Sequence, residues 1–128
     1  MIVAGVGCRR GAPAPDIEAA IRAALTRAKI STAALDAVAT SASKESETGI
    51  KTAAETFGVS LVLVPDADLQ AASDRTATRS ERVLALMGVP SVAEAAALAA
   101  AGPAGRLISP RLVIGSATCA LAASDPTP

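Results

Sequence analysis

Several residue types are scarce or missing in this chain of 128 residues, and each absence excludes a class of chemistry. Histidine is absent, which rules out Ser-His-Asp and Cys-His nucleophile activation and imidazole ligation of zinc. Phe57 is the only aromatic residue, so aromatic platforms for nucleobases or sugars have no components. We therefore expect no nucleic-acid partner.

The chain also has no net charge and few cysteines. Twelve basic and twelve acidic side chains cancel, so no long-range field attracts a polyanion or an anionic membrane. No apolar run approaches the roughly 20 residues of a membrane span, and the first residues show no signal-peptide pattern, so we expect a cytoplasmic protein without a membrane partner. Two cysteines are too few for a disulfide scaffold or an all-cysteine metal site. We interpret both as reduced thiols, with a single bridge as the alternative, and expect no bound metal or cofactor.

Apolar residues are abundant and predict one compact domain. They make up 51% of the chain, with a mean hydropathy of +0.43. We expect this domain to span residues 1–123, followed by a frayed tail at 124–128. Continuous apolar runs separated by helical patterns are typical of a parallel sheet covered on both faces. The expected class is therefore α/β, a three-layer α/β/α domain with a mainly parallel, mixed sheet.

The expected elements follow from periodicity and from stop signals such as Gly58 and Gly102. The polar segment 66–80 breaks the rhythm and is interpreted as a long loop or a partly helical stretch. The last two strands are expected to form a hairpin around Gly115. The expected strands cover residues 2–7, 35–40, 61–64, 111–114 and 118–122, and the expected helices cover 16–29, a stretch ending at 57, 83–87 and 91–101.

The loop after the first strand reads Gly5-Val6-Gly7-Cys8-Arg9-Arg10-Gly11. Ligands of open α/β sheets bind at the carboxyl ends of strands, and glycines, arginines and a helix N-terminus suit carboxylates or phosphates. A dinucleotide fingerprint would need glycine where Arg10 stands, so we expect no NAD. Two interpretations of Cys8 stay open: a nucleophile whose pKa is lowered by the arginines, or a residue of an ordinary tight turn.

Two further segments carry candidate residues. Lys44, Glu47 and Gly49 follow the second strand, where they are interpreted either as a polar binding or acid/base group or as the solvated first turn of a helix. Ser91 and Glu94 form a capping-box pattern, which favours a structural role. Small residues around Thr118 are interpreted as tight packing or as a pocket wall, and Arg106 and Arg111 as surface arginines.

The order and spacing of three segments resemble the cobalamin biosynthesis family of CobE and the C-terminal domain of CbiG. These are the glycine loop, Lys44-x-x-Glu47-x-Gly49, and Gly88-Val89-Pro90-Ser91-Val92-Ala93-Glu94. The resemblance covers residues 2–123. It implies a role in corrin ring synthesis, where CbiG-type proteins open the δ-lactone of cobalt-precorrin-5A and release acetaldehyde. A stand-alone chain of this size is more similar to CobE.

Three functions stay open under this resemblance. The first is a non-enzymatic carrier that binds a precorrin or another corrinoid tetrapyrrole, whose cobalt, where present, is held by the ring nitrogens. The second is a hydrolase of the cobalt-precorrin-5A type, with Glu47, Glu94 or Cys8 as catalytic candidates and Arg9 or Arg10 stabilising an oxyanion. The third is an accessory partner of another corrin-pathway enzyme, such as a methyltransferase. The expected ligand-binding residues are Gly5, Gly7, Cys8, Arg9, Arg10, Gly11, Lys44, Glu47, Gly49, Ser91 and Thr118.

Overall fold

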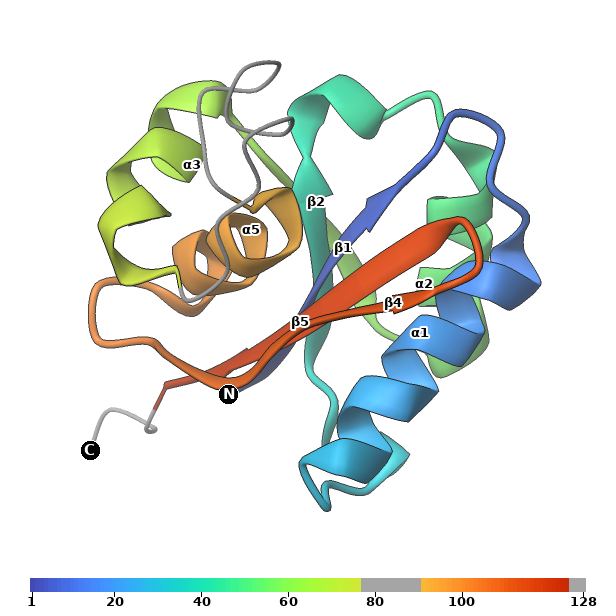
Figure 1. Ribbon diagram of the computed structural model, residues 1–128, viewed down its shortest axis with the longest axis horizontal. Coiled ribbons are helices and arrows are strands. Elements are labelled where there is room, and N and C mark those ends of the chain that lie inside the picture. The colour runs from blue at the N-terminus through green and yellow to red at the C-terminus, as the bar shows by residue number, and fades with distance from the viewer. Residues whose placement is uncertain (77–90, 125–128) are drawn as a thin grey trace.

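A computed structural model describes residues 1–76 and 91–124, and in this part of the chain a mixed sheet is covered by helices on both faces (Figure 1). The strands stand in the order β3-β2-β1-β5-β4. The strands are β1 (Ile2–Cys8), β2 (Ala37–Ser41), β3 (Ser60–Val64), β4 (Arg106–Ile114) and β5 (Ala117–Ala123). The α-helices are α1 (Ala14–Arg27), α2 (Thr48–Phe57), α3 (Asp66–Ala72) and α5 (Val92–Ala101), and three short 3-10 helices are η1 (Thr32–Ala34), η2 (Ala42–Lys44) and η3 (Ser73–Arg75).

The pairing of the strands confirms the predicted mixed sheet. β1 pairs with β2 and β2 with β3 in parallel. β5 runs antiparallel to β1, and β4 runs antiparallel to β5 as the predicted hairpin. As a result, the carboxyl ends of β1, β2 and β3 and the turn between β4 and β5 all lie at one edge of the sheet, which we call the carboxyl edge.

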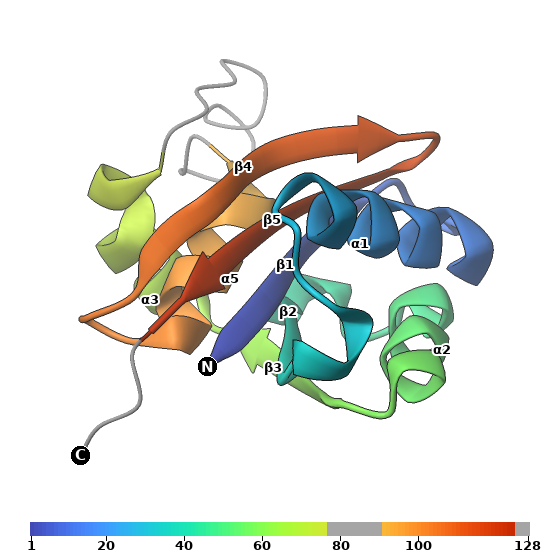
Figure 2. The same cartoon turned by 90° about the horizontal axis from the view of Figure 1, so that it is seen from below.

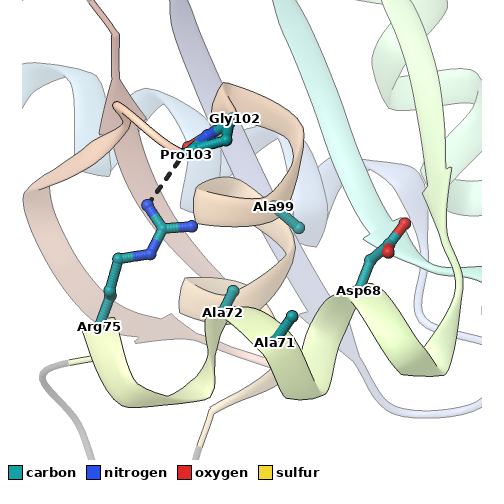
Figure 3. A pocket seen from close by; sticks show the side chains of 7 residues that line it. All are labelled: Asp68, Ala71, Ala72, Arg75, Ala99, Gly102 and Pro103. Carbon is teal, nitrogen blue, oxygen red and sulfur yellow. Dashed lines mark hydrogen bonds between the residues drawn. The ribbon is translucent and has the colours of Figure 1, made fainter.

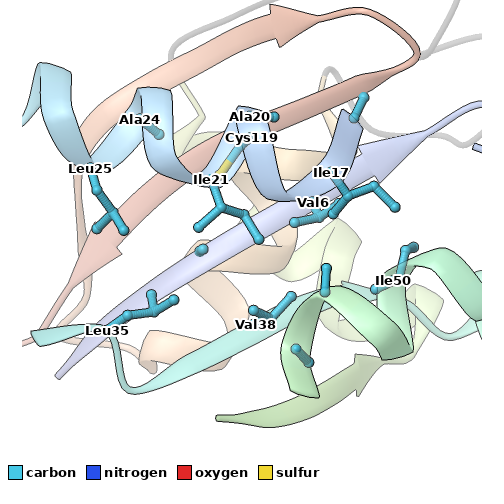
Figure 4. Close-up of a cluster of buried hydrophobic side chains, with 14 of the residues drawn as sticks. Val6, Ile17, Ala20, Ile21, Ala24, Leu25, Leu35, Val38, Ile50 and Cys119 are labelled. Carbon is cyan, nitrogen blue, oxygen red and sulfur yellow. The ribbon is translucent and has the colours of Figure 1, made fainter. Parts of the chain in front are cut away.

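Each face of the sheet has its own layer of helices and its own core. Helices α1 and α2 cover one face, here the α1 side, and α3 and α5 cover the other, the α5 side (Figures 1 and 2). The α1-side core holds large aliphatic side chains such as Ile17, Ile21 and Leu25 (Figure 4). The α5-side core is built mostly from alanines of α5 packed on the strands. The predicted three-layer α/β class is confirmed.

Alanine and glycine let α5 lie very close to the sheet. Gly5, in the middle of β1, faces this helix, and a Cβ there would overlap the carbonyl oxygen of Ala93 and lie 2.8 Å from the Cβ of Ala97. α5 is apolar nearly all round, as expected for a buried helix. Gly5 was expected in the ligand loop, but its position beneath α5 makes it a packing residue.

The boundaries of several elements differ from the expectation. α1 begins at Ala14, two residues earlier than expected: Pro13 is its N-cap residue, and Pro15 lies in the first turn, where the missing N–H of proline costs no hydrogen bond. The polar segment after β3 is helical from Asp66 to Arg75, as α3 and η3, and is anchored by buried Leu69 and Ala72, whereas residues 77–80 lie outside the described residues. The expected helix at 83–87, the motif residues 88–90 and tail residues 125–128 lie outside the described residues. Ser124, expected in the tail, exchanges backbone hydrogen bonds with Met1.

Candidate functional site

Three connections meet at the carboxyl edge of the sheet. The β1–α1 loop at residues 9–13 lies between the β2–α2 loop at 42–47 and the β4–β5 turn at 115–116, and it is hydrogen-bonded to both. The edge is therefore the place where most of the predicted site residues come together.

The β2–α2 loop is tied to the β1–α1 loop by two charged side chains. The Nζ of Lys44 donates to the carbonyl oxygen of Cys8 at 2.9 Å. The Oε1 of Glu47 accepts from the backbone N–H of Gly11 at 2.8 Å. Both side chains were expected to hold a ligand, and in the structure each satisfies a backbone group of the neighbouring loop.

The β4–β5 turn is tied to the other side of the same loop. The N–H of Arg9 donates to the carbonyl oxygen of Ser116 at 2.9 Å, which extends the β1–β5 ladder beyond Cys8. The Oδ2 of Asp16, in the first turn of α1, accepts from the hydroxyl of Ser116 at 2.7 Å and from its N–H at 3.2 Å. These hydrogen bonds lower the pKa of Asp16. Asp16 and Ser116 are 100 residues apart in the sequence, and no local pattern predicts their contact.

At two of the predicted ligand-binding glycines of this edge, other atoms of the protein fill the space that a side chain would take. A Cβ on Gly7 would lie 2.8 Å from the hydroxyl of Thr118, which donates to the carbonyl oxygen of Gly7 at 3.2 Å. A Cβ on Gly49 would overlap the carbonyl oxygen of Ala12. Gly11 has open space and a φ of 75°, so its turn requires a left-handed residue. The tight-packing interpretation therefore accounts for Gly7 and Gly49.

Of the two interpretations of Cys8, the nucleophile needs a lowered pKa, and the surroundings of the thiol have the opposite effect. Burial raises the pKa of the half-buried Cys8 thiol, although the charge of Lys44 acts in the opposite direction. Cys119 is fully buried on the α1 side, and this burial raises its pKa to about 12. Both cysteines are free thiols, as predicted.

Ser91 confirms the N-cap half of the predicted capping box. The Oγ of Ser91 accepts from the backbone N–H of Glu94 at 3.3 Å. The carboxylate of Glu94 is completely buried, and its Oε2 accepts from the N–H of Arg111 at 2.9 Å, where the pairing of β4 with β5 changes register. Both residues therefore join α5 to its surroundings, and neither stands open at the carboxyl edge.

Arg9 and Arg10 also lie at this edge, in the β1–α1 loop. Both side chains are exposed, and neither has a hydrogen bond or an ion pair within residues 1–76 and 91–124. Arg111 on β4 is half-buried, and its guanidinium likewise has no partner in the described chain. From the sequence alone Arg111 is an ordinary surface arginine, because only the pairing of β4 with β5 places it near this edge.

A separate groove of about 400 Å³ lies between α3 and α5 (Figure 3). Arg75 borders it and donates to the carbonyl oxygens of Gly102 and Gly105, at 3.2 and 2.8 Å. None of the predicted site residues belongs to this groove. It is lined by Asp68, Ala71, Ala72, Arg75, Ala99, Gly102 and Pro103.

Two kinds of feature are absent from the described residues. No group of three or more Cys, Asp or Glu side chains is placed to hold a metal ion. No helix within these residues is long and apolar enough to cross a membrane.

Comparisons with known proteins agree with this architecture. The family model for the cobalamin synthesis G C-terminus matches residues 2–122. The chain is 38% identical to Protein CobE of Sinorhizobium sp over 121 residues, which are 94% of this chain and 79% of that protein. The crystal structure of a CobE from the cobalamin (vitamin B12) biosynthetic pathway matches with a TM-score of 0.89 and 33% identity, covering 95% of this chain and 89% of the other.

Two further crystal structures are similar. The cobalamin biosynthesis protein ChiG from Agrobacterium tumefaciens matches with a TM-score of 0.75 and 43% identity, covering 98% of this chain and all of the other. A cobalamin biosynthesis protein G homolog from Sulfolobus solfataricus, 21% identical, shares the fold with a TM-score of 0.70 over 97% of this chain and 37% of its own. The chain therefore belongs to the cobalamin synthesis G C-terminus family, together with CobE, and is a protein of the cobalamin biosynthesis pathway.

Proposed function

We propose that this protein binds a precorrin at the carboxyl edge of its sheet and carries it between enzymes of the corrin pathway. The observation that carries this proposal is the pair Arg9 and Arg10, two adjacent exposed cations without a partner among the described residues. Precorrins bear several acetate and propionate groups around a large, partly apolar ring. Guanidinium groups bind carboxylates in a two-pronged geometry, so the pair fits the rim of such a ligand.

The loop that carries the two arginines is held in place before any ligand arrives. Hydrogen bonds from Lys44 to Cys8, from Gly11 to Glu47 and from Arg9 to Ser116 fix its backbone on both sides. A fixed backbone reduces the entropy lost on binding, which leaves mainly the two side chains to be ordered. Lys44 and Glu47 thus support ligand binding by holding the arginine loop.

The states of the candidate catalytic groups favour a carrier over a hydrolase. One carboxylate oxygen of Glu47 accepts a hydrogen bond from the backbone N–H of Gly11. Glu94 is completely buried, and one of its carboxylate oxygens accepts from the backbone N–H of Arg111. A general base needs access to the proton that it removes. The raised pKa of Cys8 keeps it protonated near neutral pH, which disfavours nucleophilic attack.

The test is a visible-absorption titration with hydrogenobyrinic acid and with purified precorrins, followed by gel filtration. The protein lacks Trp and Tyr, so its own absorption does not obscure the ligand bands. We expect one tetrapyrrole to be retained per chain, without conversion when the tetrapyrrole is in excess. Conversion over many turnovers would show an enzyme, and elution of every tetrapyrrole free of protein would refute ligand binding.

A matched pair of double variants tests the arginines. Arg9→Gln with Arg10→Gln removes the two open cations, whereas Lys29→Gln with Lys51→Gln removes two exposed cations elsewhere. Hydrogen bonds to charged groups contribute about 1.5–3 kcal/mol each, so we expect the arginine variant to bind at least about tenfold more weakly. The lysine variant should bind as the wild type does. Equal affinity of the two double variants would refute the role of Arg9 and Arg10.

A further inference from the structure

The exposed end of the β4–β5 hairpin carries the most exposed large apolar side chain of the described residues. Val113 is 59% exposed, against 37% for its neighbour Ile114. Monomeric domains leave single apolar residues at the surface without consequence, so the surroundings decide whether this one matters.

Strand alternation places Val113 and Arg111 on the α5 side of the sheet. Leu112, between them, packs against the α1-side core, so its two neighbours on β4 point to the opposite face. Thr118, directly opposite Val113 on β5, also points there, because both of its neighbours are buried in the α1-side core.

Arg9 extends the same arrangement onto the next strand. Cys8 packs against the α1-side core, and the hydrogen bond from Arg9 to Ser116 continues the β1–β5 ladder by one residue. Alternation therefore turns the side chain of Arg9 to the α5 side, as for Gly7. We call Arg9, Arg111, Val113 and Thr118 the hairpin patch.

The hairpin patch combines the two features that an acidic, partly apolar ring requires. An exposed valine and a hydroxyl share this face with two arginines whose guanidinium groups have no partner within the described chain. α5 packs over Gly5, which precedes Gly7 by two residues on the same face of β1. The first turn of α5 therefore lies next to the hairpin patch. Arginines at the border can bind carboxylates while the valine contacts the ring.

Resting on the proposed function, we propose that the tetrapyrrole lies on the α5 side of the carboxyl edge, with its ring against Val113 and its carboxylates at Arg9 and Arg111. This assigns Val113 and Arg111 as further binding residues and excludes the α1 side of the hairpin from the site. The charge of the patch complements the carboxylates of the ligand.

Neighbouring residues of β4 provide the test. Val113→Asp and Ile114→Asp place the same charge on consecutive residues that point to opposite faces of the sheet. We expect Val113→Asp to weaken the binding of hydrogenobyrinic acid at least tenfold, through lost apolar contact and carboxylate repulsion, and Ile114→Asp to stay within twofold of wild type. Far-UV circular dichroism verifies that each variant is folded.

A second pair keeps the test independent of any folding defect at Val113. Arg111→Gln should weaken binding about tenfold, whereas Lys51→Gln, which removes a cation from α2, should have no effect. Suppose that the wild type binds a tetrapyrrole. This inference is then overturned if Val113→Asp and Ile114→Asp lower the affinity equally, or if Arg111→Gln does not lower it, and in both cases the proposed function stands. Failure of the wild type to bind any tetrapyrrole would overturn both.

Discussion

Replacing Gly5 by alanine should destabilise the protein strongly, because α5 occupies the space of the added methyl group. The new Cβ would overlap the carbonyl oxygen of Ala93 and lie 2.7 Å from the backbone nitrogen of Ala97. These are backbone atoms of a helix, so neither can rotate away. Relief requires α5 to move off the sheet, which would open the packing of the whole α5-side core.

Gly7→Ala, two residues further along the same face of β1, is the matched control for the loss of stability expected of Gly5→Ala. Overpacking typically costs about 1–3 kcal/mol, and the backbone collision at Gly5 places it at or above the upper end. Alanine also lowers the conformational entropy of the unfolded chain, which stabilises the variant by only about 0.4–1 kcal/mol. We therefore expect a net decrease of about 2–3 kcal/mol in the free energy of unfolding. At Gly7 the added methyl meets only the hydroxyl of Thr118, which can rotate. The lost hydrogen bond costs about 1 kcal/mol, and the entropy gain nearly offsets it.

Urea unfolding followed by far-UV circular dichroism measures this difference, since the chain lacks the Trp and Tyr needed for fluorescence. With an m-value of about 1–3 kcal/mol per molar urea, a loss of about 2–3 kcal/mol means that Gly5→Ala should lower the midpoint by about 0.7–3 M at an unchanged m-value. Gly7→Ala should remain close to wild type. If the two variants unfold within about 0.5 kcal/mol of each other, the argument that α5 presses on Gly5 is refuted.

Two further predictions concern titrating groups. Cys119 is fully buried and its pKa is raised to about 12, so iodoacetamide at pH 8 should modify only Cys8, and slowly. Cys119 should react once urea unfolds the protein. Fast labelling of both cysteines, seen in mass spectra of the native protein, would contradict this. The hydrogen bonds from Ser116 lower the pKa of Asp16 below its ordinary value of 3.8, so their stabilisation is present above that pH and disappears as the pH falls through the lowered pKa. Asp16→Asn should therefore have a lower Tm than wild type at pH 7, with the gap closing at the acid end, and a gap that persists unchanged at pH 2.5 would contradict the assignment.

The parts of the fold that the sequence predicts are those specified by local signals. Apolar runs mark the strands, Gly58 adopts the left-handed conformation at the end of α2, and the hydroxyl of Ser91 caps α5. β4 was expected only from Arg111 onwards, but it begins at Arg106. Register shifts around Pro110 interrupt the pattern of period two, which an edge strand tolerates, so no regular alternation was there to be recognised.

The candidate site was harder to predict, because its contacts join segments that are distant in sequence. Lys44 and Glu47 were correctly placed at the carboxyl edge, yet the residue types alone cannot distinguish a side chain that binds a ligand from one that binds a backbone group 36 residues away. Arg111 was set aside because surface exposure is the default for arginine. Only the pairing of β4 with β5 places it beside Thr118 and Val113.

The glycines show most clearly where inference from residue types reaches its limit. Gly5, Gly7 and Gly49 were grouped with Gly11 as residues that leave room for a ligand, but in the folded chain α5, Thr118 and the loop at Ala12 fill the space beside the first three. Close approach of protein to protein and close approach of protein to ligand place the same demand on a backbone position. Under the proposed function, specificity for a tetrapyrrole would therefore come from side chains that project beyond this packed edge, and the binding tests above are aimed at four such residues: Arg9, Arg10, Arg111 and Val113.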